Sequence, residues 1–174
     1  DIISGCPGWT QGMITSDAYI RSGIAQRGVV VGSDVLSRIS DPHDRDTMIY
    51  ADGAGATIVE AVESDEPTGI LSHASRSDSV NYWNLLTNGK SFNPEFEGND
   101  QFIKMHGHKL YVYALSFVPG VVKESIDKAG LQLSDIKKVL IHQANEKMDE
   151  AILKNVFKLY HEKQIPEGIM PMSI

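Results

Sequence analysis

The sequence predicts an α/β fold with a mixed sheet, because short apolar runs alternate with longer stretches of helical periodicity. The runs at residues 29–31 and 139–141 consist of aliphatic residues and have the length of buried strands. Apolar residues recur at helical spacing in residues 110–121 and 148–159. The 174-residue length favours one domain.

The first predicted element is a helix that follows Gly5-Cys6-Pro7-Gly8-Trp9. Its apolar side chains lie near helical spacing: Trp9, Met13, Ile20. Gly23 is a suitable stop, and Pro7 suits the first helical position, where no backbone N–H is needed. Cys6 is therefore expected at or just before the start of this helix.

Three strands and a long connection are expected next. Residues 29–31 form a buried strand, residues 57–59 form another, and residues 69–74 are a weaker candidate. Asp41-Pro42 marks a turn in the polar stretch between the first two. Residues 76–100 are rich in Asn and Gly without periodicity, so we expect a long excursion over a site or a sheet edge.

The second half of the chain predicts two helices around a strand. The first helix carries Pro119-Gly120, which predicts a kink or two abutting helices, and it ends at Gly130. Residues 139–141 form a buried strand, and a helix then extends to about Tyr160. Residues 169–174 have the pattern of an edge strand, and position 1 is not Met, so we expect the chain to be a segment of a longer protein.

The composition excludes several classes of protein. The chain is 41% hydrophobic and 22% charged, which is typical of a globular protein. A net charge of −7 without a dense basic cluster argues against nucleic-acid binding. No apolar stretch has membrane-spanning length, and no signal peptide opens the chain. The single cysteine, Cys6, fits a reducing compartment, so a cytoplasmic protein is expected.

Cys6 is the first candidate catalytic residue. A helix N-terminus favours the thiolate, and Gly5 and Gly8 allow a ligand to approach closely. A buried and inert cysteine is the alternative. His142 is the second candidate, because it directly follows a predicted strand and is accompanied by Gln143 and Asn145. It could donate to an oxyanion or act as a general base, whereas the alternative is a cluster that caps the next helix.

Other motifs carry weaker signals. His106 and His108 have no third ligand at a suitable spacing, so no metal site is predicted. The glycines of residues 52–56 precede a strand, which disfavours a dinucleotide loop. A papain-like protease would also use a cysteine and a histidine, but its local signature requires a cysteine where this chain has Ile3.

Several motifs together resemble the beta-ketoacyl-ACP synthase III family of the thiolase-like fold. They occur in the family's order and span almost the whole chain: Gly5-Cys6-Pro7-Gly8-Trp9, Val30-Val31-Gly32-Ser33-Asp34, Asp41-Pro42-His43-Asp44-Arg45, Asp52-Gly53-Ala54-Gly55-Ala56, Met105-His106-Gly107 and Ile141-His142-Gln143-Ala144-Asn145. The resemblance implies a layered α/β/α fold with mixed sheets, present here only in part. It assigns residues 1–62 to the end of the first thiolase-like half and residues 63–174 to most of the second.

The resemblance also implies a mechanism. The cysteine, here Cys6, takes an acyl group from acyl-CoA, and malonyl-ACP then loses CO2 and attacks the acyl-enzyme to give a beta-ketoacyl-ACP. The catalytic histidine is His142, and a catalytic asparagine would lie beyond Ile174. Arg45 and Gly107 would face the CoA or pantetheine arm, Asn145 would help to hold it, and Lys147 would meet the acidic carrier protein.

The implied enzyme is an acyltransferase that needs no cofactor and forms a homodimer. Its substrates are acyl-CoA and malonyl-ACP, and it binds neither nucleic acid nor a membrane. Two alternatives keep the fold: an acyltransferase of secondary metabolism and a non-catalytic partner subunit. The presence of both Cys6 and His142 disfavours the second of these.

Overall fold

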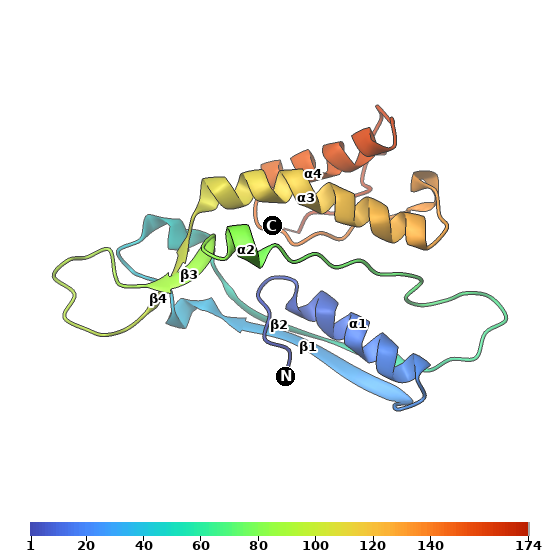
Figure 1. Cartoon of the computed structure of the whole chain (residues 1–174), viewed down its shortest axis with the longest axis horizontal. Helices are drawn as coiled ribbons and strands as arrows, with labels where there is room; N and C mark the ends of the chain where they lie inside the picture. The colour runs from blue at the N-terminus through green and yellow to red at the C-terminus, as the bar shows by residue number, and fades with distance from the viewer. Residues whose placement is uncertain (174) are drawn as a thin grey trace. The chain divides into compact units, whose positions relative to one another are not determined.

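The computed structural model describes residues 1–173 and divides into two compact units (Figure 1). Unit 1 comprises residues 1–71 and 89–103, and unit 2 comprises residues 72–88 and residues 104 onward. Each unit contains helix and extended chain, which is consistent with the α/β class predicted from the sequence.

Unit 1 is a helix packed on a two-stranded antiparallel sheet. Helix α1 (Gly8–Arg21) lies along strands β1 (Arg27–Val35) and β2 (Asp52–Glu60), as Figure 1 shows. The two strands pair from Arg27 opposite Glu60 to Val35 opposite Asp52. A short 3-10 helix, η1 (Leu36–Arg38), follows β1. Helix α1 begins at Gly8 with Pro7 as its N-cap, one position later than the sequence predicted.

Glycines allow α1 to approach the sheet closely. A β-carbon on Gly12 would lie 2.7 Å from Cγ1 of Val30, and a β-carbon on Gly32 would lie 3.2 Å from Cβ of Trp9. Real β-carbons essentially never make the first of these contacts, and the second is tighter than most. The separation of helix and strand in unit 1 is therefore set by the absence of side chains at these two positions.

Only one face of the β1–β2 sheet is covered. Val30 is 8% exposed on the helix side, whereas Val29, Val31 and Ile58 on the opposite side are 65%, 61% and 68% exposed. Val29 and Ile58 are directly paired, so their side chains lie on the same face. The prediction of a strand at residues 29–31 is confirmed, but the prediction that it is buried is wrong for two of its three residues.

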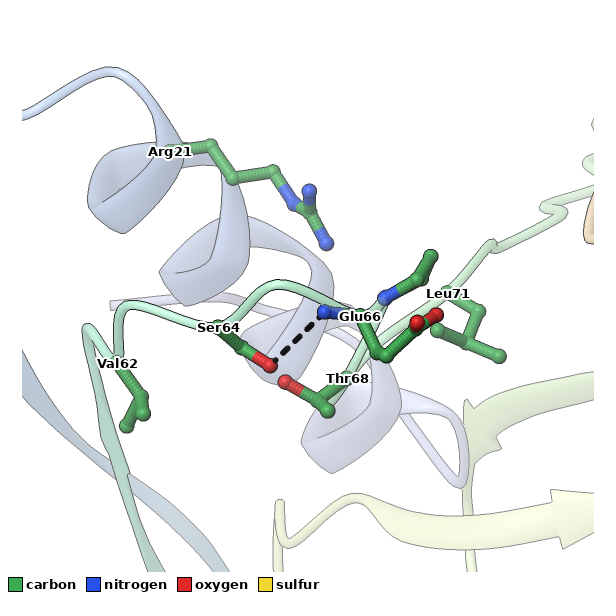
Figure 2. Close-up of a pocket in the computed structure, with 7 residues that line it drawn as sticks. Arg21, Val62, Ser64, Glu66, Thr68 and Leu71 are labelled. Atoms are coloured by element: carbon green, nitrogen blue, oxygen red, sulfur yellow. Dashed lines mark hydrogen bonds between the residues drawn. The ribbon is translucent and has the colours of Figure 1, made fainter.

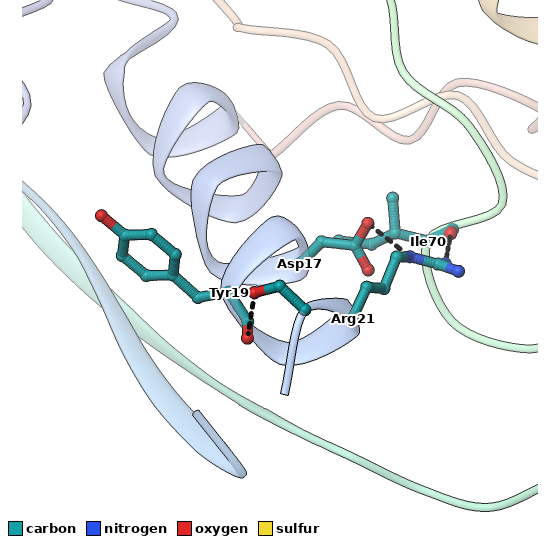
Figure 3. A network of polar contacts seen from close by, with 5 residues as sticks. Asp17, Tyr19, Arg21 and Ile70 are labelled. Atoms are coloured by element: carbon teal, nitrogen blue, oxygen red, sulfur yellow. Dashed lines mark hydrogen bonds and ion pairs between the residues drawn. The ribbon is translucent and has the colours of Figure 1, made fainter. Parts of the chain in front are cut away.

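The end of α1 is fastened by a small polar network (Figure 3). The Nε of Arg21 pairs with Oδ2 of Asp17 at 2.8 Å, and its NH2 group donates to the carbonyl of Ile70 at 2.6 Å. Gly23, with φ of +75°, follows the helix as the sequence predicted. The predicted weak strand at residues 69–74 is wrong, because this stretch has no strand pairing.

Unit 2 is built on two helices. It contains α2 (Ser79–Tyr82), α3 (Gly107–Lys128), a 3-10 helix η3 (Leu133–Asp135) and α4 (Glu146–Leu159). Strands β3 (Leu86–Gly89) and β4 (Phe102–Met105), whose residues are divided between the two units, form a second two-stranded sheet, so the predicted excursion at residues 76–100 contains short regular elements. Pro119 lies inside α3, which is one helix and not two.

The core of unit 2 forms where α3 packs against α4. Its buried members are apolar and come from both helices and from the segments that follow them: Ile126, Leu133, Leu153, Val156, Phe157, Ile169. The predicted buried strand at residues 139–141 is wrong, since these residues have no strand pairing and Leu140 is 84% exposed. A backbone bond from the N–H of Val139 to the carbonyl of Ile169, at 2.8 Å, joins this segment to the end of the described chain.

Candidate active site

Cys6 lies in the turn that leads into α1 and is exposed. The turn is closed by a bond from the N–H of Gly8 to the carbonyl of Gly5, at 2.8 Å. No acidic residue lies in the first turn of α1. The alternative of a buried cysteine is therefore wrong, and the thiol is accessible near the positive end of a helix, where the thiolate is stabilised.

Tyr50 is a neighbour of Cys6 that the sequence analysis missed. Its pKa is raised, first by burial and then by the negative charges of Asp44, Cys6 and Asp46. The neutral phenol is therefore favoured at this position. The only signal in the sequence was an aromatic residue just before the glycine-rich entry to β2.

Arg45 begins the 3-10 helix η2 (Arg45–Ile49) and its side chain is 96% exposed. Its Nε lies 3.8 Å from Oδ1 of Asp46, a loose ion pair. The preceding turn is anchored by Asp41, which is completely buried. The carboxylate of Asp41 accepts from the backbone N–H of Phe92 at 2.7 Å and from the hydroxyl of Ser91 at 2.9 Å. A fixed loop thus presents an accessible guanidinium.

His142 is exposed and lies in the segment just before α4. The next side chain, Gln143, fixes this segment: its amide donates to the carbonyl of Pro171 at 3.0 Å, and its oxygen accepts from the backbone N–H of Ser173 at 3.0 Å. The imidazole is therefore carried by a tethered segment and not by the strand that the sequence predicted.

Asn145 is the N-cap of α4, as the capping interpretation of this motif predicted. Its side-chain oxygen accepts from the backbone N–H of Met148 at 3.2 Å. Lys147 is exposed in the first turn of the same helix. Gly107 begins α3, and a β-carbon there would meet only Cε of Met105, at 3.8 Å. Cys6 and Arg45 thus belong to unit 1, whereas His142, Asn145, Lys147 and Gly107 belong to unit 2.

Asp149, in the first turn of α4, is a second residue that the sequence analysis missed. It is 0% exposed, and neither carboxylate oxygen has a hydrogen-bond partner among the described residues. Burial raises the pKa of Asp149, and the charge of His142 opposes this effect.

Two pockets of the structure are lined by none of these candidate residues. One, of about 250 Å³, is lined in part by Arg21, Val62, Ser64 and Thr68 (Figure 2). Another, of about 220 Å³, lies between α4 and residues 165–170. Within residues 1–173, no three potential ligand side chains gather to hold a metal ion. In the same range, no helix has the length and apolarity needed to cross a membrane.

The known proteins to which this chain is similar share one description. Residues 1–79 match the family model of 3-oxoacyl-[acyl-carrier-protein] synthase III. A beta-ketoacyl-[acyl-carrier-protein] synthase III of Allorhizobium ampelinum is 33% identical over 160 residues, 90% of this chain and 49% of the relative. Another, from Bartonella henselae, is 35% identical over 161 residues, which again cover 90% of this chain and 49% of the relative. The chain thus spans about half the length of the curated relatives it matches.

Solved structures give the same result. The chain is similar to beta-ketoacyl-[acyl-carrier-protein] synthase III of Thermus thermophilus, with 29% identity, a TM-score of 0.78, and coverage of 90% of this chain and 49% of that one. The corresponding enzyme of Pseudomonas aeruginosa is 26% identical, with a TM-score of 0.75 and coverage of 86% and 45%. A priming beta-ketosynthase of a polyketide pathway is 21% identical, with a TM-score of 0.75 and coverage of 95% of this chain and 47% of that one. At this identity the likeness shows a common fold alone.

Proposed function

We propose that the full-length protein belongs to the beta-ketoacyl-ACP synthase III family and is a condensing acyltransferase of fatty-acid synthesis, because residues 1–79 match the family model, and the curated relatives and solved structures that the chain resembles carry that name. It transfers an acyl group from acyl-CoA to Cys6 and then condenses that group with malonyl-ACP to give a beta-ketoacyl-ACP. The observation that carries the proposal is an accessible Cys6 at the start of α1 in a chain that also holds His142 before α4.

Cys6 is the nucleophile of the first half-reaction. The thiolate attacks the thioester carbonyl, the bond to the CoA sulfur breaks, and CoA leaves as its thiol after taking a proton. The start of α1 favours the thiolate because its backbone N–H groups and dipole are positive there. Exposure of the thiol supports this role, since acyl-CoA must reach the sulfur atom.

His142 is the oxyanion donor of the second half-reaction. Loss of CO2 from the malonyl group leaves an enolate whose negative charge gathers on the thioester oxygen. A neutral imidazole N–H aimed at that oxygen stabilises the enolate, and the enolate carbon then attacks the acyl-enzyme and releases Cys6. The asparagine that the resemblance assigns beyond residue 174 would be the second donor.

The remaining candidate residues bind substrates. The exposed guanidinium of Arg45 is suited to the phosphates or the adenine of CoA. The backbone of Gly107 and the side chain of Asn145 would contact the pantetheine arm. Lys147, on a chain of net charge −7, is a basic residue suited to the acidic carrier protein. The proposal includes a cytoplasmic location and a homodimer.

A mass-spectrometric experiment tests the proposal. The full-length protein is incubated with acyl-CoA and digested, and the peptide that contains Cys6 should gain the mass of one acyl group. Cys6→Ser should abolish the label, while Ser4→Ala, a change two residues away, should retain it. Acyl transfer with an unmodified Cys6, or no transfer from any acyl-CoA, would contradict the proposed function.

A further inference from the structure

The buried carboxyl group of Asp41 joins two loops of unit 1. Asp41 is 0% exposed, and its carboxylate accepts hydrogen bonds from both loops. One donor, the backbone N–H of His43 at 3.0 Å, belongs to the same turn. The hydroxyl of Ser91, at 2.9 Å, and the backbone N–H of Phe92, at 2.7 Å, belong to the segment that precedes β4. Removal of a carboxylate from water is costly, and these hydrogen bonds offset that cost only while the two loops stay together.

The backbone of Asp41 extends the same network to the residues on either side of Arg45. The carbonyl of Asp41 accepts from the N–H of Asp44 at 3.0 Å and from the hydroxyl of Thr47 at 3.2 Å. Asp44 is the N-cap of η2, and the hydroxyl of Thr47 also lies 2.7 Å from its carbonyl. Arg45, the first residue of η2, therefore lies between two residues that are bonded to Asp41.

Other interactions contribute little to the position of η2. Met48 and Ile49, the apolar residues of this short helix, are 84% and 57% exposed, so they bury little apolar surface. The ion pair of Arg45 with Asp46 spans 3.8 Å between exposed groups, a kind of pair that adds little stability. The hydrogen bonds of Asp41 are therefore the main restraint on the turn that carries Arg45.

We propose that Asp41 is a positioning residue for Arg45: its carboxylate holds the turn at residues 41–47 against residues 91–93, so that the guanidinium extends from a fixed point toward CoA. This inference rests on the proposed role of Arg45 in binding CoA. A fixed backbone beneath a long side chain reduces the conformational entropy that is lost on binding. Residues 91–93 thus influence the affinity for CoA through Asp41.

The substitution Asp41→Asn distinguishes positioning from simple electrostatics, because the two predict opposite changes. CoA is an anion, so the loss of a nearby negative charge should by itself tighten binding. The amide of Asn, however, places a donor where one carboxylate oxygen accepts, so the two loops lose part of their connection. Calorimetric titration of the full-length protein with CoA should show a Kd raised by about fivefold, a coupling typical of residues in one hydrogen-bond network. An unchanged or lower Kd in folded Asp41→Asn would overturn the proposal.

A double-mutant cycle tests whether Asp41 acts through Arg45. In the Arg45→Ala background, Asp41→Asn should change the Kd for CoA by less than about twofold, because the side chain that it positions is already absent. A purely structural role of Asp41 would weaken CoA binding by the same factor in both backgrounds. Equal factors would therefore overturn the proposal.

Two further variants serve as the control and as a milder test. Asp17→Asn removes a carboxylate of unit 1 that pairs with Arg21, and it should leave the Kd for CoA unchanged. Ser91→Ala removes one donor to Asp41 without a change of charge, so it should raise the Kd by a smaller factor, and only when Arg45 is present. Thermal unfolding checks each variant. If Asp41→Asn does not fold, a normal Kd in Ser91→Ala would overturn the proposal.

Failure of this inference is distinguishable from failure of the proposed function. If the cycle gives the expected coupling but Cys6 gains no acyl group from acyl-CoA, the proposed function fails and the role of Asp41 stands. If Cys6 is acylated but the effects of Asp41→Asn and Arg45→Ala are additive, the inference alone fails. If the parent protein does not bind CoA, the proposed role of Arg45 and this inference are both wrong.

Discussion

At the scale of single residues, the proposed chemistry separates into two half-reactions with different requirements. Acylation needs an accessible thiolate, and Cys6 has the exposure and the position at a helix start that favour one. Decarboxylation needs a donor that faces a developing negative charge, which is the proposed task of His142. Variants of single residues should therefore affect one step and leave the other.

Replacement of His142 by Ala should separate the two steps. The variant should still accept an acyl group from acyl-CoA, because the start of α1 stabilises the thiolate without the imidazole. Malonyl decarboxylation should fall by about two to three orders of magnitude, the usual cost of removing an oxyanion donor. Both rates are measured on one preparation, and loss of acylation with intact decarboxylation would instead make His142 the general base of Cys6.

Replacement of Arg45 by Ala should weaken the binding of acyl-CoA more than it slows the chemistry. Contacts to phosphate or adenine are similar in the ground state and the transition state, so KM should rise while kcat changes little. Steady-state kinetics with varied acyl-CoA measure both constants. Arg27→Ala, which removes an exposed arginine paired with Glu60, is the control and should leave KM unchanged.

The sequence predicted some of these residues and not others, for a physical reason. Cys6, Arg45 and His142 lie in short motifs whose residue types and order are informative without a structure. Asp149 has the sequence pattern of an ordinary surface acid in a first helical turn, and only packing buries it. Tyr50 is likewise brought near Cys6 by folding. Their effects depend on neighbours that are distant in the chain or hidden by the fold.

At the scale of elements, local patterns predicted the helices better than the strands. Helices α1, α3 and α4 satisfy their own backbone groups, so spacing and caps suffice to predict them. A strand requires a neighbour that the local sequence does not specify. Residues 139–141 have the composition of a buried strand, but the structure supplies one backbone bond to Ile169 and leaves Leu140 exposed.

Asn145, the N-cap residue of α4, has a structural role and a proposed binding role that can be tested separately. Asn145→Ala should lower the free energy of unfolding by about 1 kcal/mol, the typical cost of losing an N-cap side chain. Asn145→Asp should keep this stability, because its carboxylate also accepts from the N–H of Met148 and is favoured at a helix start.

The same pair of variants tests the proposed contact of Asn145 with the pantetheine arm. An aspartate cannot replace the amide donor, so the KM for acyl-CoA should rise in both variants although only Asn145→Ala is less stable. Denaturant unfolding and steady-state kinetics measure the two effects separately. A normal KM in Asn145→Asp would leave the residue with the capping role alone.

At the scale of the whole molecule, the sequence predicted the family and the thiolase-like fold. Solved structures with TM-scores of 0.75 and 0.78 support the fold for the part that this chain covers, and the curated relatives agree with the predicted family over about half of their length. The proposed division into residues 1–62 and 63–174 stays a prediction, since the two compact units of the structure are a different partition of the chain. Long-range assembly is the property that local patterns specify least, because it depends on which surfaces meet.

The uncovered face of the β1–β2 sheet leads to a prediction about the surface of the whole chain. Val29, Val31 and Ile58 present adjacent apolar side chains to solvent. The 174-residue chain produced by itself should therefore bind a hydrophobic dye, and a variant with Val29→Thr, Val31→Thr and Ile58→Thr should bind much less of it. Thr57→Val, on the other face of the same strand, is the control. Weak dye binding by the parent chain would contradict this expectation.

The contact between α1 and β1 has a consequence for how this protein can evolve. Gly12 and Gly32 leave no room for even a methyl group without a shift of Val30 or Trp9, whereas nothing lies within 4 Å of a β-carbon added at Gly53 or Gly55. In a library of random variants, the first two positions should be depleted of every other amino acid and the latter two should tolerate alanine. Gly12 and Gly32 fix the path of the helix that begins beside Cys6. Selection for a correctly placed Cys6 would therefore also conserve these two glycines, although neither is proposed to touch a substrate.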